Sequence, residues 1–315
     1  IFHMGNLTEV TQFVLLGIPH TKGLKTILFI VFLTFYLCTL LGNLLIMMSV
    51  LLDSRLHTPM YFFLCNLSIL DISISSVSTP KMLANLWAQS RIISWSGCMS
   101  QVFFFHCLAC TECLLCTVMV YDRYIAICHP LRYLIIMNWK VCVILAASTW
   151  IVGSFHATIL TSLTFMLPYC GSNEVDYYFC DIFPLVKLAC ANTVIIETVS
   201  LINIGVLGTM YFFLILASYL RVFYSILQMA SGEGQRKAVS TCVSHLTVVT
   251  FFFGPCVLIY TRPSQSEILV TSVHIFNNIV TPLLNPVVYT LRNKEVKAAL
   301  RRLMGSQKVS EKNAN

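Results

Sequence analysis

The sequence predicts an all-α membrane protein, a bundle of seven transmembrane helices followed by a short amphipathic helix in the cytosol. Three observations predict this fold class. Hydrophobic residues make up 57% of the 315 residues and charged residues only 10%, whereas a soluble protein carries roughly 25% charged residues. Long stretches of the chain contain no charge. The net charge of +7 comes from Lys and Arg residues that fall between the apolar runs, which excludes the clustered basic face of a nucleic-acid-binding protein.

The distances between successive charges define the spans, because a helix needs about 20 mostly apolar residues to cross a bilayer. Five runs without charge are long enough: Lys25 to Asp53, Lys140 to Glu174, Glu197 to Arg221, Lys237 to Arg262 and Glu267 to Arg292. Two more runs are nearly free of charge. The run from Pro59 to Trp87 contains Asp71 and Lys81, and the run from Ile92 to Tyr121 contains Glu112. Seven spans place the two termini on opposite sides of the membrane.

The orientation follows from the basic residues, because short cytoplasmic loops hold an excess of Lys and Arg. Fourteen of the 20 fall on the side of the carboxyl terminus, so we expect a plasma-membrane protein with an extracellular amino terminus. Asn6 begins a glycosylation sequon that agrees with this side. We expect an extracellular segment of residues 1–25, a transmembrane domain of residues 26–291, and a cytoplasmic helix and tail of residues 292–315.

The tail is predicted to begin with an interfacial helix. Apolar residues recur there at helical spacing, at Val296, Ala299, Leu300, Leu303 and Met304. Lys297, Arg301 and Arg302 fall on other faces, where a basic surface would meet anionic lipid headgroups. A merely solvated basic tail is the alternative.

Four cysteines stand apart from those inside the spans. Cys170, Cys180 and Cys190 lie in the long extracellular loop, and Cys98 begins the third span on the same, oxidising side. Four cysteines allow three pairings, and spacing alone does not choose among them. Two bridges would tie this loop down over the mouth of the bundle.

Two carboxylates, Asp71 and Glu112, lie in the middle of spans, with Asn43 and Asn285 as further polar groups. A charge at the bilayer centre costs on the order of 3 kcal/mol, so each is a candidate site. The two acids could share a proton or coordinate a sodium ion. A structural hydrogen-bond network explains the same residues equally well.

Two motifs mark the cytosolic ends of the third and seventh spans. Asp122, Arg123 and Tyr124 follow one another at the membrane edge, where an arginine held by its neighbour can later reach another partner. In the seventh span Pro286 follows Asn285, and a proline interrupts the helical hydrogen bonds and gives a place to bend.

These motifs carry a resemblance that covers nearly the whole chain. The sequence resembles the rhodopsin-like G-protein-coupled receptors, and within them the vertebrate olfactory receptors. The resemblance also rests on four segments, residues 59–64, 67–71, 218–219 and 237–246. Three residues depart from the usual pattern: Tyr177 replaces a common His, Asn192 a common Asp, and Phe253 a common Tyr. The Tyr177 departure argues against a copper-binding loop.

The resemblance implies disulfides between Cys98 and Cys180 and between Cys170 and Cys190. It implies a ligand cavity within the bundle whose lining comes from four spans, the third, fifth, sixth and seventh. The implied lining residues are Phe105, His106, Ala109, Cys110, Asn203, Leu207, Phe253, Cys256, Val257, Tyr260, Ile275 and Asn278.

The implied cavity is apolar with a few hydrogen-bonding tips, which suits a small neutral ligand. Phe105 replaces the Asp of amine receptors, and the seventh span has no Lys for a retinal Schiff base. A soft metal could use His106, Cys110 and Cys113, but a cysteine-rich helix explains these residues, so no metal or cofactor other than sodium is expected.

The resemblance implies an odorant receptor of sensory-neuron cilia that activates a stimulatory, olfactory-type G protein and raises cyclic AMP. We expect Arg123 to leave Asp122 on activation, and the G protein to enter a cleft bordered by Tyr219, His245, Tyr289 and the basic segment Arg236-Lys237. A receptor of the same family that senses metabolites in another tissue is one alternative, and a channel or carrier is another. An enzyme is not expected, because no nucleophile, base and orienting group stand at a recognisable spacing.

Overall fold

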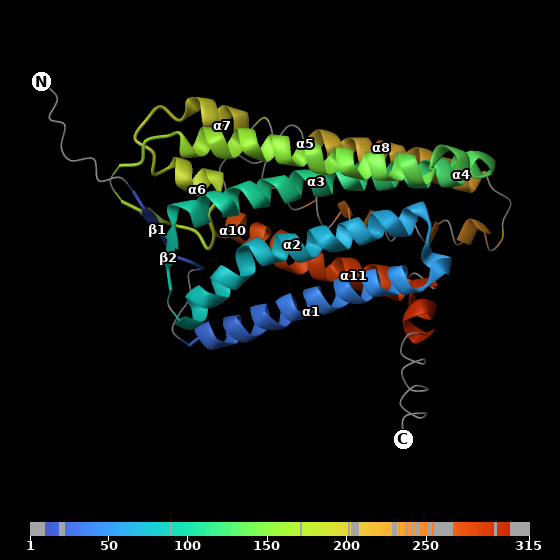
Figure 1. Ribbon diagram of the computed structural model, residues 1–315, viewed down its shortest axis with the longest axis horizontal. Helices are drawn as coiled ribbons and strands as arrows, with labels where there is room; N and C mark the ends of the chain where they lie inside the picture. Colours follow the sequence, from blue (N-terminus) through green and yellow to red (C-terminus); the bar gives the residue numbers. More distant parts are fainter. Residues whose placement is uncertain are drawn as a thin grey trace, which may run out of the picture.

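The computed structural model describes residues 10–18, 23–88, 90–170, 172–200, 202, 208–228, 267–292 and 295–302, with isolated positions between 232 and 254. Long helices run side by side along the molecule (Figure 1). The strands β1 and β2 and the short helix α6 lie at one end of this bundle, and α4 lies at the other end. This arrangement places a cap at one end of the bundle and short turns at the other end.

The first four expected spans form long apolar helices. These are α1 (Lys25–Leu52), α2 (Pro59–Ala88), α3 (Trp95–Cys128) and α5 (Trp139–Phe165), each long and apolar enough to cross a membrane. Two have N-caps that the sequence encodes: Ser94 Oγ accepts from Gly97 N at 3.1 Å, and Asn138 Oδ1 accepts from Val141 N at 3.2 Å. Such caps satisfy amide groups that the first helical turn leaves free.

The third span differs from its predicted bounds. Residues Ile92–Ser94 form the strand β2, and α3 begins at Trp95. The helix then continues past Tyr121 to Cys128. A charge-free run locates the hydrocarbon-crossing part of a helix, whereas the hydrogen-bonded helix extends into the polar interface.

The later spans are described in part. Within the fifth expected span, α7 (Val194–Ser200) and α8 (Gly208–Leu227) are helical, and α8 passes Arg221. The sixth expected span lies almost wholly outside the described residues. The seventh consists of α10 (Glu267–Ile275), the π-helix η4 (Phe276–Val280) and α11 (Thr281–Arg292), with Pro286 inside α11. The irregular turn therefore precedes the proline by several residues.

The cap contains a small sheet that the composition does not indicate. Strand β1 (Gln12–Leu15) pairs antiparallel with β2 and parallel with β3 (Glu174–Val175), in the order β2-β1-β3. Phe13 and Leu15 have no exposed surface. Phe13 stacks on Trp95 with ring centroids 5.4 Å apart. The amino-terminal segment is thus part of the cap that covers the bundle.

The end of the bundle opposite the cap is closed by short turns and by the helix of residues 295–302. The turns are η1 (Ser54–Leu56), η2 (Pro130–Arg132) and α4 (Tyr133–Ile136). Val296 and Ala299 are fully buried against α1 and α2, as their spacing predicts, whereas Leu303 and Met304 lie outside the described residues.

Arg302 corrects the expectation of a free basic face on the tail helix. Its guanidinium forms an ion pair with Asp53, and Nε donates to Asp53 Oδ2 at 3.1 Å. The hydrogen bond from Arg302 holds the pKa of Asp53 below its usual value. Lys297 and Arg301 remain exposed, so only part of the predicted basic face is available to lipid.

Helices α3 and α5 approach most closely at Gly153. A Cβ atom there would overlap Thr111 Oγ1 and would lie 2.7 Å from the backbone oxygen of Cys107. Small residues allow such close approach between membrane helices. The two helices can hold this separation only with glycine at position 153.

We predict that Gly153→Ala lowers the free energy of unfolding by about 2 kcal/mol, because the overpacked methyl group forces α5 away from α3. The thermal unfolding midpoint of the purified protein in detergent measures this loss. Gly208→Ala is the matched control, because its Cβ would meet no atom within 4 Å. Equal midpoints for the two variants would contradict the close packing.

Candidate functional site

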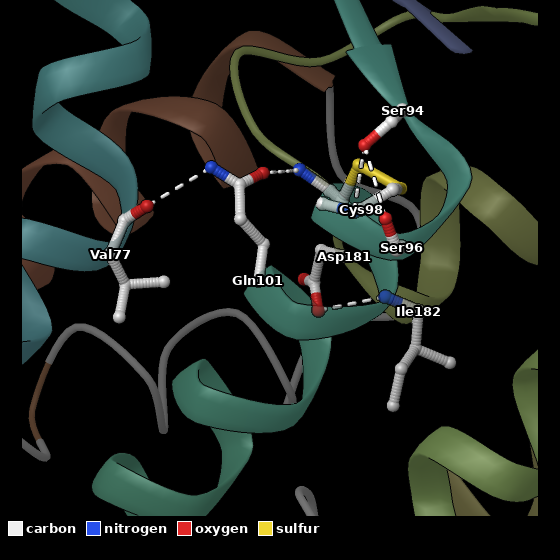
Figure 2. Close-up of a disulfide and its surroundings, with 9 residues drawn as sticks. Val77, Ser94, Ser96, Cys98, Gln101, Asp181 and Ile182 are labelled. Carbon is white, nitrogen blue, oxygen red and sulfur yellow. Dashed lines mark hydrogen bonds between the residues drawn. A yellow bond between two sulfur atoms is a disulfide. The ribbon is translucent and has the colours of Figure 1, made fainter. Parts of the chain in front are cut away.

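The long loop after α5 contains both of the implied disulfides: one fixes it to α3, and the other closes the loop on itself. Cys98 at the start of α3 pairs with Cys180, with Cα atoms 5.4 Å apart, and Cys170 pairs with Cys190, with Cα atoms 5.9 Å apart. Gln101, one turn after Cys98, completes the attachment (Figure 2): its Nε2 donates to the oxygen of Val77 and its Oε1 accepts from Cys180 N, both at 3.0 Å. We call residues 169–190 the lid.

The lid inserts a buried carboxylate, Asp181, between two helices. Asp181 Oδ1 accepts from Ile182 N at 2.8 Å, as Figure 2 shows, and lies 3.0 Å from His106 Nε2 on α3. Its Oδ2 lies 3.9 Å from His274 Nδ1 on α10. Burial raises the pKa of Asp181, but the hydrogen bond and charge of His106 outweigh this effect and hold the pKa below its usual value. An ionised carboxylate carries no proton, so Nε2 of His106 must be the donor.

Two tyrosines of the lid make further contacts with the seventh span. Tyr177 Oη lies 2.6 Å from His274 Nδ1, and Tyr178 Oη accepts from Asn278 Nδ2 at 3.0 Å. His106 and Asn278, which were expected to meet the ligand, therefore already have partners in the lid. A ligand that uses either group has to compete with a lid residue.

Sequence reasoning missed Asp181 and His274. His274 is the one histidine in the run from Glu267 to Arg292, and a titratable side chain inside a span is itself a signal for a site. Asp181 offered a weaker signal, its place directly after Cys180. Asp181 could not be paired with His106 from the sequence, because the contact joins positions 75 residues apart.

The described part of the implied ligand lining lies directly beneath the lid. Phe105 packs edge-on against Phe179 of the lid, with ring centroids 5.0 Å apart, and lies 6.5 Å from the His274 ring. Ala109, Cys110 and Ile275 are half-buried. The other implied residues, Asn203, Leu207, Phe253, Cys256, Val257 and Tyr260, lie outside the described residues.

The polar centre of the bundle is built around Asp71 and Asn285. The Asn285 amide donates to both carboxylate oxygens of Asp71, at 2.8 and 3.0 Å. Asn43 makes different contacts, donating to the backbone oxygens of Thr39 and Pro282. Glu112 is also buried, but within the described part of the chain no hydrogen bond joins it to Asp71. The arrangement links α2 to α11 and α1 to α11.

The acidic and basic residues at the carboxyl end of α3 form an ion pair in which Asp122 is buried and Arg123 is partly buried. Arg123 donates to Asp122 Oδ2 through Nε at 3.0 Å, and Tyr133 Oη donates to Asp122 Oδ1 at 2.8 Å. Tyr124 packs edge-on against His129. Tyr219 of α8 is buried in the same region, against Val120. The described side chains thus hold Arg123 in place through Asp122.

Three expected site residues lie wholly or partly outside the described residues. Two belong to the expected cytosolic cleft, and one is the expected glycosylation site. His245 and Asn6 lie outside the described residues, and only the backbone of Tyr289 is described. Pro286 lies against Gly42 of α1, where a Cβ would be 3.0 Å from the proline ring. Among the described residues, no group of three metal-binding side chains is close enough to hold a metal ion.

Comparisons with known proteins give a consistent result. A family model described as olfactory receptor matches residues 32–308. The chain is 54% identical to olfactory receptor 10D3 of Mus musculus over 307 residues, 97% of this chain and 98% of the relative. It is 54% identical to olfactory receptor 10D3 of Homo sapiens over 299 residues, 95% and 96% of the two chains. Olfactory receptor 10G4 of Homo sapiens is 50% identical over 301 residues, 95% and 97% of the two chains.

We predict that Asp181→Asn lowers the free energy of unfolding at pH 7 by roughly 2 kcal/mol, because it removes a charged partner of a buried hydrogen bond. The folded-state pKa of Asp181 is lowered, so its stabilising effect is complete above the ordinary value of 3.8 and is lost as the pH falls below it. Thermal midpoints measured from pH 7 to pH 3 should therefore differ at neutral pH and converge in acid. Asp176→Asn, an exposed position in the same loop, is the control. A difference that persists unchanged at pH 3 would contradict this role.

Proposed function

The chain belongs to the olfactory receptor family, and from that premise we propose that it binds a small neutral odorant within the helix bundle and activates a stimulatory, olfactory-type G protein. The family consists of multi-pass receptors of the plasma membrane with seven transmembrane helices, and not of enzymes. The chain is an odorant receptor on this evidence. The ligand class, the G protein and the orientation in the membrane are the proposed parts.

The described surroundings of the cavity support a neutral ligand. The groups that could bond a polar ligand, His106 and Asn278, are engaged by Asp181 and Tyr178 of the lid. The described lining that remains is mainly apolar, as Phe105 and the residues near it show. The buried carboxylate of Asp181 at the mouth of the cavity disfavours an acid. It offers no free counter-charge to an amine, because it is already paired with His106. Neutral ketones, esters, alcohols and thiols are therefore the expected ligands.

The ion pair of Asp122 and Arg123 is the single observation that carries the proposed signalling mechanism. Ligand binding shifts an equilibrium toward an arrangement in which the sixth span moves outward and Arg123 leaves Asp122. A cleft opens beside Tyr124 and Tyr219, with His245 and Tyr289 at its border. The carboxy-terminal helix of a G-protein α subunit enters this cleft. Cyclic AMP then rises in the cell, which for this family we propose to be an olfactory sensory neuron with the receptor in its cilia.

The proposed orientation places the lid and the amino terminus outside the cell. The two disulfides support this side, because such bonds form in an oxidising compartment. The helix of residues 295–302, with exposed Lys297 and Arg301, then faces the cytosol. A receptor of the same family that senses metabolites elsewhere is the alternative. A channel is disfavoured, because Asp71 and Asn285 bond each other rather than line a path.

A sodium ion beside Asp71 is also a proposal. The Oδ1 atoms of Asn43 and Asn285 are buried without a hydrogen-bond partner, and sodium takes oxygen ligands. If sodium binds there, it raises the thermal unfolding midpoint of the wild-type receptor relative to potassium at equal ionic strength. Asp71→Asn removes the sodium-specific rise. A rise of equal size in both proteins, or none in the wild type, would exclude this site.

We predict that Arg123→Gln abolishes the odorant-driven rise in cyclic AMP while surface expression stays unchanged. The substitution keeps the approximate shape of the side chain but removes the positive charge that the G protein engages. A cyclic AMP assay with a panel of neutral volatiles, beside surface labelling, measures both quantities. An undiminished response would contradict the assignment of Arg123.

Tyr133→Phe should have the opposite effect and raise basal cyclic AMP. The lost hydrogen bond to Asp122 weakens the resting arrangement by about 1 kcal/mol, which corresponds to roughly a fivefold larger active population. Tyr224→Phe is the matched control, because Tyr224 is an exposed tyrosine of α8. A basal signal equal to that of the control would remove Tyr133 from the mechanism.

A further inference from the structure

A groove of about 340 Å³ lies between α3 and α8, far from the lid. Four residues of each helix line it: Thr117, Val120, Tyr121, Tyr124, Leu214, Ile215, Ser218 and Arg221. Its floor is the packed seam between the helices, where Val120 and Ile215 are 3% and 1% exposed. Its rim is open, because Tyr121 and Leu214 are 45% and 50% exposed. The groove therefore faces outward from the bundle, where the surrounding medium is lipid.

The dimensions of the groove match part of one leaflet. It extends over eight residues of each helix, from Thr117 to Tyr124 and from Leu214 to Arg221, which is about 10 Å from end to end at the rise of an α-helix. One leaflet contributes about 15 Å of hydrocarbon. The groove ends beside Asp122 and Arg123, at the cytosolic end of α3 in the proposed orientation. It can therefore hold the part of an acyl chain that lies nearest to the headgroup.

The polar atoms of the groove are distributed unevenly. Ser218 Oγ donates to Leu214 O at 2.8 Å, and Thr117 Oγ1 donates to Cys113 O at 3.1 Å. These two hydroxyls have thus used their hydrogens within their own helices, so that part of the wall offers an occupant no donor. A long apolar chain fits such a wall, whereas a polar solute leaves its acceptors unpaired.

Arg221 supplies the charge at the end of the groove. Arg123 and Arg302 form ion pairs with carboxylates, whereas Arg221 is exposed and has no such partner among the residues that the structure describes. A guanidinium group binds phosphate oxygens through two parallel hydrogen bonds. The groove thus combines an apolar channel with one unpaired cation at its headgroup end.

We propose that this groove binds an anionic glycerophospholipid, with an acyl chain between α3 and α8 and the phosphate on Arg221. The groove borders the helical segment that carries Asp122 and Arg123, so its occupant contacts the part of α3 on which the proposed switch depends. The site itself requires only that the chain lies in a membrane, which the family establishes.

The test measures bound lipid directly, with phosphatidylserine as the probe. The full receptor is reconstituted in nanodiscs of equimolar phosphatidylserine and phosphatidylcholine, moved to a mild detergent and washed, and its retained lipids are counted by native mass spectrometry. Wild type should retain phosphatidylserine over phosphatidylcholine. Arg221→Gln should lower the preference for phosphatidylserine about fivefold, because the attraction of one basic residue to an anionic lipid surface corresponds to about that factor.

Two further variants separate the site from general attraction. Ser218→Phe fills the groove but keeps Arg221, and should cause the same loss. Arg132→Gln removes an exposed arginine outside the groove and should change nothing. Size-exclusion profiles and thermal midpoints establish folding, and Ser218→Phe decides the question if Arg221→Gln does not fold.

The proposal is overturned if all four proteins retain phosphatidylserine to the same extent, because the retained lipid is then loosely held bulk lipid only. It is also overturned if Ser218→Phe keeps the full preference, or if a sterol displaces phosphatidylserine regardless of Arg221. None of these measurements needs an odorant or a G protein. Their failure is therefore distinct from a failure of the proposed function.

Discussion

The structure depends on one constraint, that a polar group in the low-dielectric interior of a membrane bundle needs a partner. Asp71 receives both its hydrogen bonds from Asn285, 214 positions later in the chain. Asp122 accepts hydrogen bonds from Arg123 and Tyr133. The bonds from Asn285 join α11 to α2, and the bond from Tyr133 joins α4 to α3, so these two buried carboxylates also specify which elements lie together.

Helix α3 carries most of these pairings along its length. It carries the disulfide of Cys98 in its first turn, His106 with its partner Asp181 further along, and the Asp122–Arg123 ion pair near its end. The distance from Cys98 to Arg123 along the helix is about 37 Å, longer than the hydrocarbon core. One rigid element therefore connects the lid to the proposed switch. The close contact at Gly153 holds α5 against this element.

The helical framework and the family could be predicted from the sequence, because charge spacing and short motifs are local properties. The expected runs from Lys25, Pro59 and Lys140 match observed helices. The lid could not be predicted. Phe13 is buried through a strand pairing with residues about 80 and 160 positions away, and a six-residue apolar stretch gives no sign of such partners. Arg302 was expected on the lipid-facing side of the tail helix. Its ion pair with Asp53 could not be predicted, because Asp53 lies 249 positions earlier in the chain.

Buried polar groups act as pairs across the bundle, and a double-mutant cycle at Asp71 and Asn285 measures this pairing. Thermal unfolding of wild type, Asp71→Asn, Asn285→Ala and the double variant gives the interaction energy of the two side chains. We expect a coupling of at least about 1 kcal/mol, with the double variant more stable than the sum of the two single effects implies. Additive effects within about 0.3 kcal/mol would mean that the two side chains do not act as a pair.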